Sequence, residues 1–382
     1  MPADVRLGGR AGALRQGTRV KQFIAIVLTL IPAIARGAVW QYGGFTDVGY
    51  LYDSNDPSNR LFRSRGTTFH VNEADLNMAA LYLKKPASDS SRWGLELTAQ
   101  TGKDSEIFGF SASAPNVGES DWLTHLGSTN VSYLAPSGLA VQGGIFGSLI
   151  GYDSLYAKDN FTYTRPWGAD FTPYLMLGVN AAYPMTKTVT GTAFVVNGYW
   201  HLAHANDVPS IGGQIAWKPA DGKTFKQTIL YGPHQSNTDV EFWRFLADSI
   251  YELKRDRFTG AFEYFVGTER IDAPGKPRAL WMSAQLPVHW SLSPRLSFTL
   301  RPEVYWDRDG RTTLYRQTVN ANTTTLEYRI PYGRTATILR LEHRLDGSRG
   351  RDGGFFKDGT LTPAQNLLIF GVIVSFDSGA GH

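Results

Sequence analysis

The sequence predicts an all-β protein, a transmembrane antiparallel up-and-down β-barrel of about sixteen strands. Three observations predict it. Apolar and polar residues alternate with a period of two from residue 40 onward, which is the pattern of strands with two unlike faces. Most alternating segments are about 9–13 residues long, the length with which a tilted strand crosses a membrane. The connections between these segments are short and long in turn, as in an up-and-down barrel.

The expected strands follow one another along the chain. The alternation is clearest in 296–307, where one face carries Leu296, Phe298, Leu300, Pro302, Val304 and Trp306 and the other carries Ser297, Thr299, Arg301, Glu303, Tyr305 and Asp307. The same criterion gives strands at 40–52, 69–83, 92–101, 123–134, 138–147, 174–184, 187–199, 210–218, 224–232, 241–252, 256–267, 278–290, 295–307, 321–330, 335–346 and 365–376.

The connections sort into two sets by length. The shorter ones lie near 84–91, 135–137, 184–187, 219–223, 253–256, 291–294 and 331–334. The longer ones are 53–68, 102–122, 148–173, 200–209, 233–240, 268–277, 308–320 and 347–364. A soluble sandwich has no reason to keep this parity through sixteen strands, whereas a membrane barrel has short turns on one side and long loops on the other.

The two faces of the strands can be assigned from the solvent. Every backbone N–H and C=O needs a partner in hydrocarbon, so a spanning sheet must close on itself and turn its apolar face to lipid. The polar face then lines a lumen that sixteen strands make wide enough for water. The expected lumen residues are Glu96, Gln142, Arg301, Glu303, Arg329, Arg340 and Glu342, of which the last five form the candidate pore wall; the expected girdle aromatics are Tyr52, Tyr133, Trp200, Trp217, Tyr251, Trp290 and Trp306.

The first 37 residues are expected to be an export signal that precedes a barrel domain at 38–382. Six basic residues flank the apolar run 23–35, which is too short to span a bilayer as a helix, and small residues stand at 35 and 37 for cleavage. Without this segment the chain holds 32 basic and 33 acidic residues. That balance argues against a nucleic-acid partner. With no cysteine and no second apolar run, the segment predicts a periplasmic, secreted or outer-membrane location in a bacterium.

Several stretches resemble a known family. The segments GYDSLYAKDNFTYTRPWGADFTPYLMLGV (151–179), TAFVVNGYW (192–200) and GGQIAWKP (212–219), with the opening GGFTDVGYLYDSN (43–55), are similar to the OmpL-like β-barrel porins of Gram-negative bacteria. The terminal apolar strand 366–376 also resembles the assembly signal of such barrels, although six residues follow its last phenylalanine. The resemblance implies an outer-membrane pore for small hydrophilic solutes, with lipids as neighbours and a possible homo-oligomer.

The stretch 159–170, DNFTYTRPWGAD, interrupts the β-pattern within the third long connection. Connections of this length are functional or disordered, and three aromatics with Pro166 and Gly168 favour order. We expect it to fold into the lumen and narrow it. The candidate constriction consists of charged residues of the connection 148–173, which would face the wall arginines and filter polar solutes through a transverse field: Asp153, Asp159, Arg165 and Asp170. The alternative is that the charges only anchor the loop by ion pairs. The aromatics are expected to pack the loop rather than stack on sugars.

Other functions have weaker support. A barrel enzyme of lipase type would need a serine beside His289 or His343, and a secreted soluble carbohydrate-binding β-protein would turn its apolar faces to one core. His201 and His204 lack a third metal ligand, and the Asp- and Gly-rich segments 307–311 and 346–359 are expected to be solvated loops rather than Ca²⁺ sites. Neither a catalytic fingerprint nor a cofactor or metal is expected.

Overall fold

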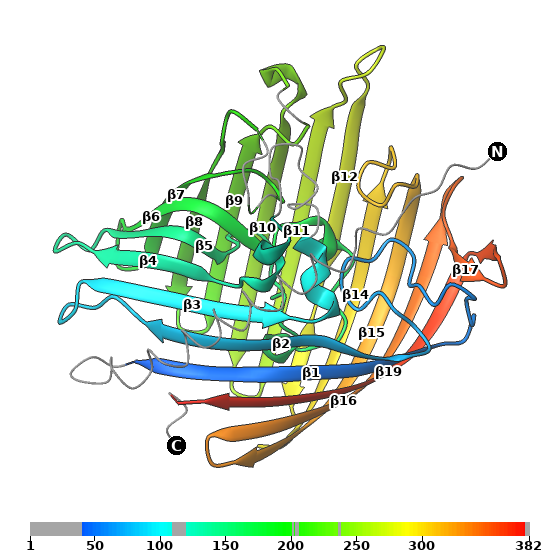
Figure 1. Ribbon diagram of the computed structural model, residues 1–382, viewed down its shortest axis with the longest axis horizontal. Coiled ribbons are helices and arrows are strands. Elements are labelled where there is room, and N and C mark those ends of the chain that lie inside the picture. The colour runs from blue at the N-terminus through cyan, green and yellow to red at the C-terminus, as the bar shows by residue number, and fades with distance from the viewer. Residues whose placement is uncertain (1–39, 109–119, 201, 203–205, 236–237, 379–382) are drawn as a thin grey trace, which may run out of the picture.

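The chain forms one closed antiparallel barrel (Figure 1). The computed structural model describes residues 40–108, 120–200, 202, 206–235 and 238–378. The barrel strands are β1 (Gln41–Asp53), β2 (Ala74–Lys85), β3 (Trp93–Thr101), β4 (Thr129–Leu134), β5 (Ala140–Gly147), β6 (Leu175–Pro184), β7 (Val189–Val196), β8 (Ser210–Ala220), β9 (Lys223–Gly232), β10 (Arg244–Arg255), β11 (Phe258–Arg270), β12 (Arg278–Gln285), β13 (Val288–Ser291), β14 (Leu296–Asp307), β15 (Gln317–Tyr332), β16 (Thr335–Arg349) and β19 (Ala364–Asp377).

Apart from β12 and β13, consecutive barrel strands pair with each other, and β1 pairs with both β2 and β19, which closes the sheet. The prediction of sixteen strands is confirmed with one refinement. The expected strand 278–290 is split into β12 and β13, which both lie between β11 and β14. Pro287 stands in the gap, and because it has no N–H it cannot continue the ladder.

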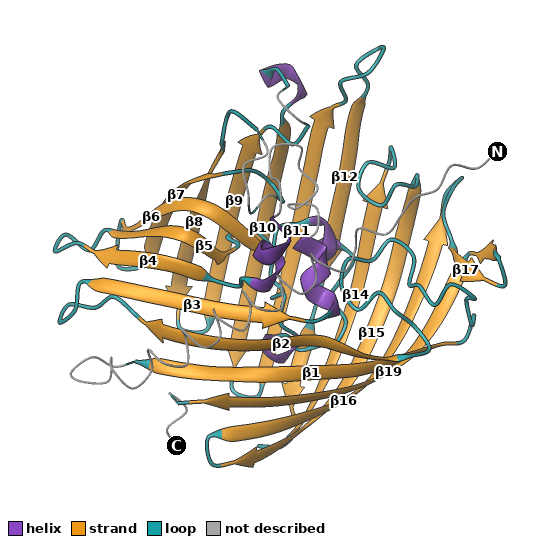
Figure 2. Cartoon of the chain, viewed as in Figure 1, coloured by secondary structure: helices purple, strands orange, loops and turns teal. Residues whose placement is uncertain are grey.

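The connections keep the expected parity. The long loops, numbered in order, are L1 (54–73), L2 (102–128), L3 (148–174), L4 (197–209), L5 (233–243), L6 (271–277), L7 (308–316) and L8 (350–363). Figure 2 shows their 3-10 helices, which are η1 (Lys103–Phe108) and η2 (Ser120–His125) in L2, η3 (Ala157–Asp159) and η4 (Gly168–Phe171) in L3, and η5 (Val240–Phe242) in L5. L8 holds the hairpin of β17 (Phe355–Lys357) and β18 (Thr360–Thr362). Among the described residues, no helix is long and apolar enough to cross a membrane.

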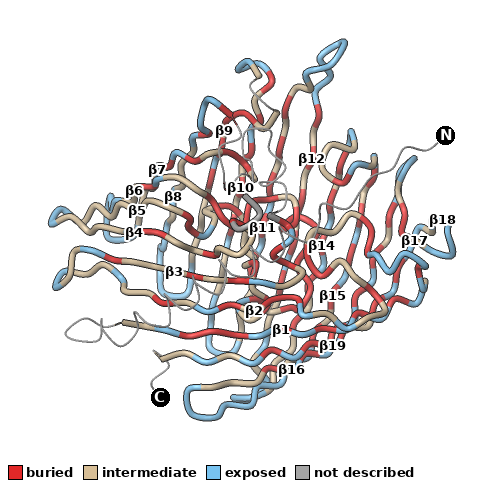
Figure 3. Tube along the Cα trace, viewed as in Figure 1, coloured by how far each residue is buried: buried red, intermediate tan, exposed pale blue. Residues whose placement is uncertain are grey.

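The strands expose their apolar faces and bury their polar ones. Figure 3 shows buried and exposed residues along the strands by colour. On β16, Leu341 and Leu345 are exposed, whereas Arg340, Glu342 and Arg344 on the other face are buried. A soluble sandwich would show the opposite arrangement, so the structure corrects that alternative. A surface of this kind is stable only when hydrocarbon surrounds it.

Aromatic side chains gather at the barrel end that carries the short turns. The ring of Trp93 lies 4.8 Å from that of Tyr133, and Trp290 lies 5.8 Å from Phe258 and 5.9 Å from Phe298. Such rings suit the interface between lipid and water. The prediction was wrong for Trp200, which is in L4 and packs against the buried cluster inside the barrel. Its position after strand β7 made it look like a strand-end aromatic.

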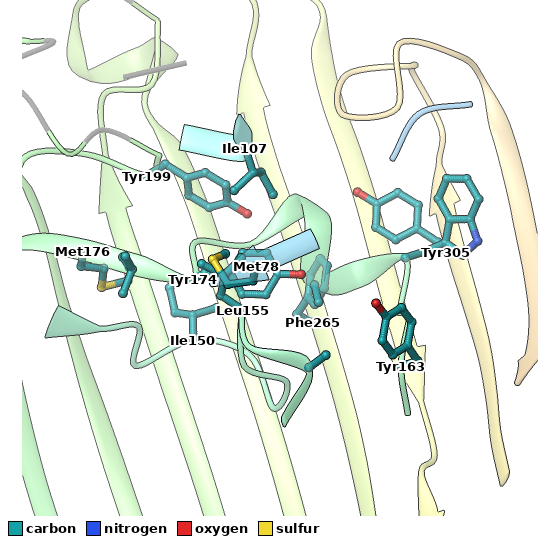
Figure 4. Packing of buried hydrophobic residues seen from close by; sticks show 14 of the residues in the cluster. Met78, Ile107, Ile150, Leu155, Tyr163, Tyr174, Met176, Tyr199, Phe265 and Tyr305 are labelled. Carbon is teal, nitrogen blue, oxygen red and sulfur yellow. The ribbon is translucent and has the colours of Figure 1, made fainter. Parts of the chain in front are cut away.

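Side chains of the inward-folded loops fill part of the lumen. Apolar side chains from L1, L2 and L3 meet inward-facing apolar side chains of the wall in one buried cluster. Figure 4 shows Leu155, Tyr163 and Tyr174 of L3 among these side chains, together with Phe265 of β11 and Tyr305 of β14. The interior of this barrel is therefore organised by its loops, with L3 at the centre.

Candidate functional site

L3 crosses the interior of the barrel. It leaves β5 and returns to β6, yet the backbone N–H of Gly151 donates to Asp248 Oδ2 on β10 at 2.9 Å. Further along, the Tyr163 hydroxyl donates to Asp47 Oδ1 on β1 at 2.6 Å. Because β1 pairs with β2 and β19 whereas β10 pairs with β9 and β11, the two strands lie far apart around the sheet, and a loop that reaches both must lie within the lumen. The expected position of the interruption at 159–170 agrees with this path.

Carboxylates of the wall hold the backbone of L3. Glu342 accepts from the backbone N–H groups of Tyr163 at 2.5 Å and Thr164 at 3.0 Å, and Glu303 accepts from the backbone N–H of Trp167 at 2.5 Å. L3 has little secondary structure at this point, so its buried N–H groups need partners from elsewhere. The two acidic residues of the candidate pore wall supply them.

Arginines of the same wall hold the carbonyl groups of L3. Their guanidinium groups donate to L3 carbonyl oxygens, from Arg301 to Thr164 (2.8 Å), from Arg340 to Ala157 (2.6 Å), Asn160 (2.5 Å) and Thr162 (3.0 Å), and from Arg344 to Arg165 (2.9 Å). The five donors of a guanidinium in a planar fork suit such multiple contacts. Arg301, Arg340 and Arg344 are therefore occupied by the loop.

Two buried ion pairs join L3 to the other inward loops. Arg165 Nη2 lies 2.8 Å from Asp104 Oδ2 of L2, and Arg65 Nε of L1 lies 3.0 Å from Asp170 Oδ2, with all four side chains fully buried. Asp170 also accepts from the Gly66 N–H at 3.0 Å. Burial raises the pKa of Asp104, and the Arg165 guanidinium opposes that rise. Each pair is a cross-link between loops rather than a charge that faces water.

The candidate constriction residues thus fall into two groups. Arg165 and Asp170 are buried anchors, and Asp153 accepts a hydrogen bond from Gln285 of β12 at 2.6 Å. Asp159 is different, because it is exposed at the turn of η3, where its carboxylate lies 2.6 Å from Lys158 Nζ. Arg329 of the pore wall is also exposed. The structure therefore leaves Asp159 and Arg329 as the members of the expected set that face open space.

The aromatic residues of the interruption pack against the wall. Tyr163 and Trp167 are buried, and the indole Nε1 of Trp167 donates to Asp346 Oδ1 at 2.8 Å. Phe161 stacks on His289 of β13 with ring centroids 4.2 Å apart. These contacts correspond to the expectation that the aromatics hold the loop in place.

The residues that the less supported functions would need do not form such sites in the described part of the chain. His201 and His204 lie outside the described residues. Asp307 is buried at the end of β14, where its carboxylate accepts from the N–H groups of three L7 residues, Arg311, Thr312 and Thr313, at 2.8–2.9 Å. It therefore organises L7, and 346–359 contributes to β16 and the L8 hairpin. His289 contacts Thr299 and His343 contacts Asn366; within the described chain, neither imidazole bonds a serine hydroxyl.

Sequence reasoning missed several members of this network, among them Arg344, Arg65 and Asp104. Arg344 shares the polar face of β16 with Arg340 and Glu342, so the alternation alone could have identified it. Arg65 and Asp104 stand in long loops without periodicity, and no local pattern indicates that they turn inward. A charged residue in a loop is read as solvated unless its partner is known.

Comparison with known proteins agrees with this geometry. The chain is similar in fold to the outer membrane channel DcaP of Acinetobacter baumannii (TM-score 0.56, 12% identity, 90% of this chain and 98% of that one). It is similar also to OmpF of Salmonella typhi in complex with daunomycin (0.56, 8%, 89% and 98%), and to the trimer form of OmpT of Vibrio cholerae (0.50, 9%, 89% and 99%). No curated protein sequence matches the chain. The family model described as "Putative beta-barrel porin-2, OmpL-like" matches residues 40–376, and the chain belongs to this family of outer-membrane β-barrel porins.

Proposed function

We propose that the porin is a passive channel whose free cross-section is set by L3. The observation that carries this proposal is the path of L3 through the lumen, held on the wall by Glu303, Glu342, Arg301 and Arg340. A constriction that is held by buried hydrogen bonds keeps its shape while solutes pass. Size selection for small hydrophilic solutes follows from such a fixed opening.

Within this constriction we assign different roles to the predicted residues. Asp153, Arg165 and Asp170 on the loop, and Arg301, Glu303, Arg340 and Glu342 on the wall, brace L3. Asp159 and Arg329 contact passing solutes, since their side chains stay exposed inside the barrel. Most of the predicted charged residues thus brace the loop. Asp159 and Arg329 supply the electrostatic filtering that a field of opposed charges provides.

Export, surroundings and assembly belong to the same proposal. The leader 1–37 directs the chain out of the cytoplasm, and residues 38–382 insert in the outer membrane. Assembly as a homo-oligomer is supported by the solved trimer form of the Vibrio cholerae OmpT. A passive channel performs no catalysis, and the contacts of His289 and His343 with Thr299 and Asn366 give the lipase alternative no support.

Purified protein is expected to conduct ions in a planar lipid bilayer in discrete steps, because a water-filled barrel connects the two sides. The same preparation should migrate differently on a gel before and after boiling, which shows that the barrel is folded. A preparation that shows the mobility shift but no conductance would contradict the proposed function.

A further inference from the structure

A cavity of about 260 Å³ lies inside the barrel between the turn of L3 and the wall near the short turns. L3 contributes Lys158, Asp159 and Phe161, and the wall contributes residues of β13 to β16 and of the turn 292–295. Since short turns face the periplasm in barrels of this kind, a solute that has passed L3 enters this cavity next. Its volume is smaller than the usual drug-sized pocket and suits a small molecule.

The cavity carries an excess of positive charge. Four basic side chains line it, namely Lys158, Arg295, Arg329 and Arg340, against two acidic ones, Asp159 and Glu327. Both acids are engaged. Asp159 lies 2.6 Å from Lys158, and Glu327 lies 2.7 Å from Arg340 and 3.8 Å from Arg329.

Arg295 and Arg329 are the basic residues of the cavity whose guanidinium donors remain available for a ligand. In the described part of the chain, no carboxylate lies within ion-pair distance of the Arg295 guanidinium. Arg329 and Arg340 both contact the Glu327 carboxylate, and Arg329 is the more distant of the two. Both side chains are exposed to the cavity solvent. An exposed guanidinium with unused donors binds a carboxylate through two parallel hydrogen bonds. The cavity walls concentrate anions in front of them.

An apolar surface lies beside these charges. Phe161 stacks on His289 at an interplanar angle of 13°, and the His289 Nδ1 is 2.9 Å from the Thr299 hydroxyl. This contact fixes the imidazole and leaves Phe161 partly exposed to the cavity. A bare inorganic anion gains nothing from such a surface, whereas the hydrocarbon part of an organic anion loses unfavourable contact with water there.

We propose that this cavity is a subsite for small organic carboxylates on the periplasmic side of L3, with Arg295 and Arg329 as the carboxylate-binding groups and Phe161 as the apolar contact. The inference rests on the proposed channel function, since the solute arrives through the lumen. It deepens that function by naming a solute class.

The test uses the full-length channel in planar bilayers with sodium benzoate as the probe. Benzoate is expected to reduce the chloride current of the wild type as it occupies the cavity. In R295Q/R329Q the half-blocking concentration should rise by about tenfold, the equivalent of roughly 1.4 kcal/mol of lost binding. The permeability ratio of anion to cation should fall as well. R295K/R329K keeps the charge and should retain more of the block.

The control variant K187Q/R255Q removes two positive charges from the short-turn side outside the cavity, where both side chains are exposed. It should keep the wild-type block. If R295Q/R329Q conducts but is blocked by benzoate as well as the wild type, or if the wild type conducts and is not blocked, the subsite is overturned while the channel function stands. If the wild type does not conduct, the channel function fails and the subsite fails with it.

Discussion

Replacing Arg165 by methionine is expected to lower the free energy of unfolding by about 3–5 kcal/mol, the usual cost of removing one partner from a buried ion pair. Arg165 and Asp104 are fully buried, with 2.8 Å between Nη2 and Oδ2. The variant removes the ion-pair partner of the buried Asp104 carboxylate. Urea unfolding in lipid vesicles, followed by tryptophan fluorescence, measures the change.

The loss should depend on pH. Burial raises the pKa of Asp104, and Arg165 opposes the rise, so the variant raises that pKa further. In the unfolded chain the pKa returns to about 4. Between the pKa of Asp104 in the unfolded chain and its higher pKa in the native variant, the native state binds a proton that the unfolded state has released. The stability of the variant therefore falls as the pH rises through this range. The destabilisation by R165M should accordingly be greater near pH 8 than near pH 5.

Two further variants separate the ion pair from general damage. Removing both charges in D104L/R165M should recover part of the lost stability, because no charge is then left buried without a partner. R92Q breaks the pair of Arg92 with Asp89, which is 2.8 Å long but has Asp89 almost fully exposed, and should cost less than about 1 kcal/mol. If R165M is as stable as R92Q, the buried pair does not hold the loops together.

Replacing 158–168 by two glycines is expected to raise the single-channel conductance by roughly twofold or more, because the segment occupies the lumen. Its removal also frees Arg301 and Glu342 from their L3 partners and leaves Arg340 with the Ala157 carbonyl alone among its three L3 acceptors. Water fills the vacated space and solvates these charges, so the barrel should still fold. Conductance steps in planar bilayers give the result.

The matched control is the replacement of 272–276 in L6 by two glycines, since these residues are exposed beyond the end of β11. It should leave the conductance at the wild-type value. A folded 158–168 variant with unchanged conductance would place the segment outside the conducting path.

The barrel itself could be predicted from the sequence because strand periodicity is a local property. Leu341 and Arg340 fall on opposite faces of β16 whatever the rest of the chain does. The break at Pro287 was missed because the alternation continues across it. Parity of the connections also placed L3 correctly, since it depends only on the order of the strands.

The contacts of L3 could not be predicted from the sequence, because they join segments far apart in the chain. Asp170 meets Arg65 of L1, and Arg165 meets Asp104 of L2. The spacing of these residues in the sequence does not predict that they meet inside the barrel. The sequence argument weighed anchoring against selectivity, and the distances now show which charges take part in anchoring. Asp159 and Arg329 stay exposed, and we propose that they contact the solute.

The most direct test of this account is the rate at which liposomes that contain the wild-type porin swell in neutral sugars of increasing size. Neutral sugars report the free cross-section without the influence of charge. The account predicts fast swelling for the smallest sugars and a steep fall with size, because L3 is a rigid constriction. Equal rates for small and large sugars would show that L3 does not narrow the lumen, and no swelling with any sugar would contradict the channel itself.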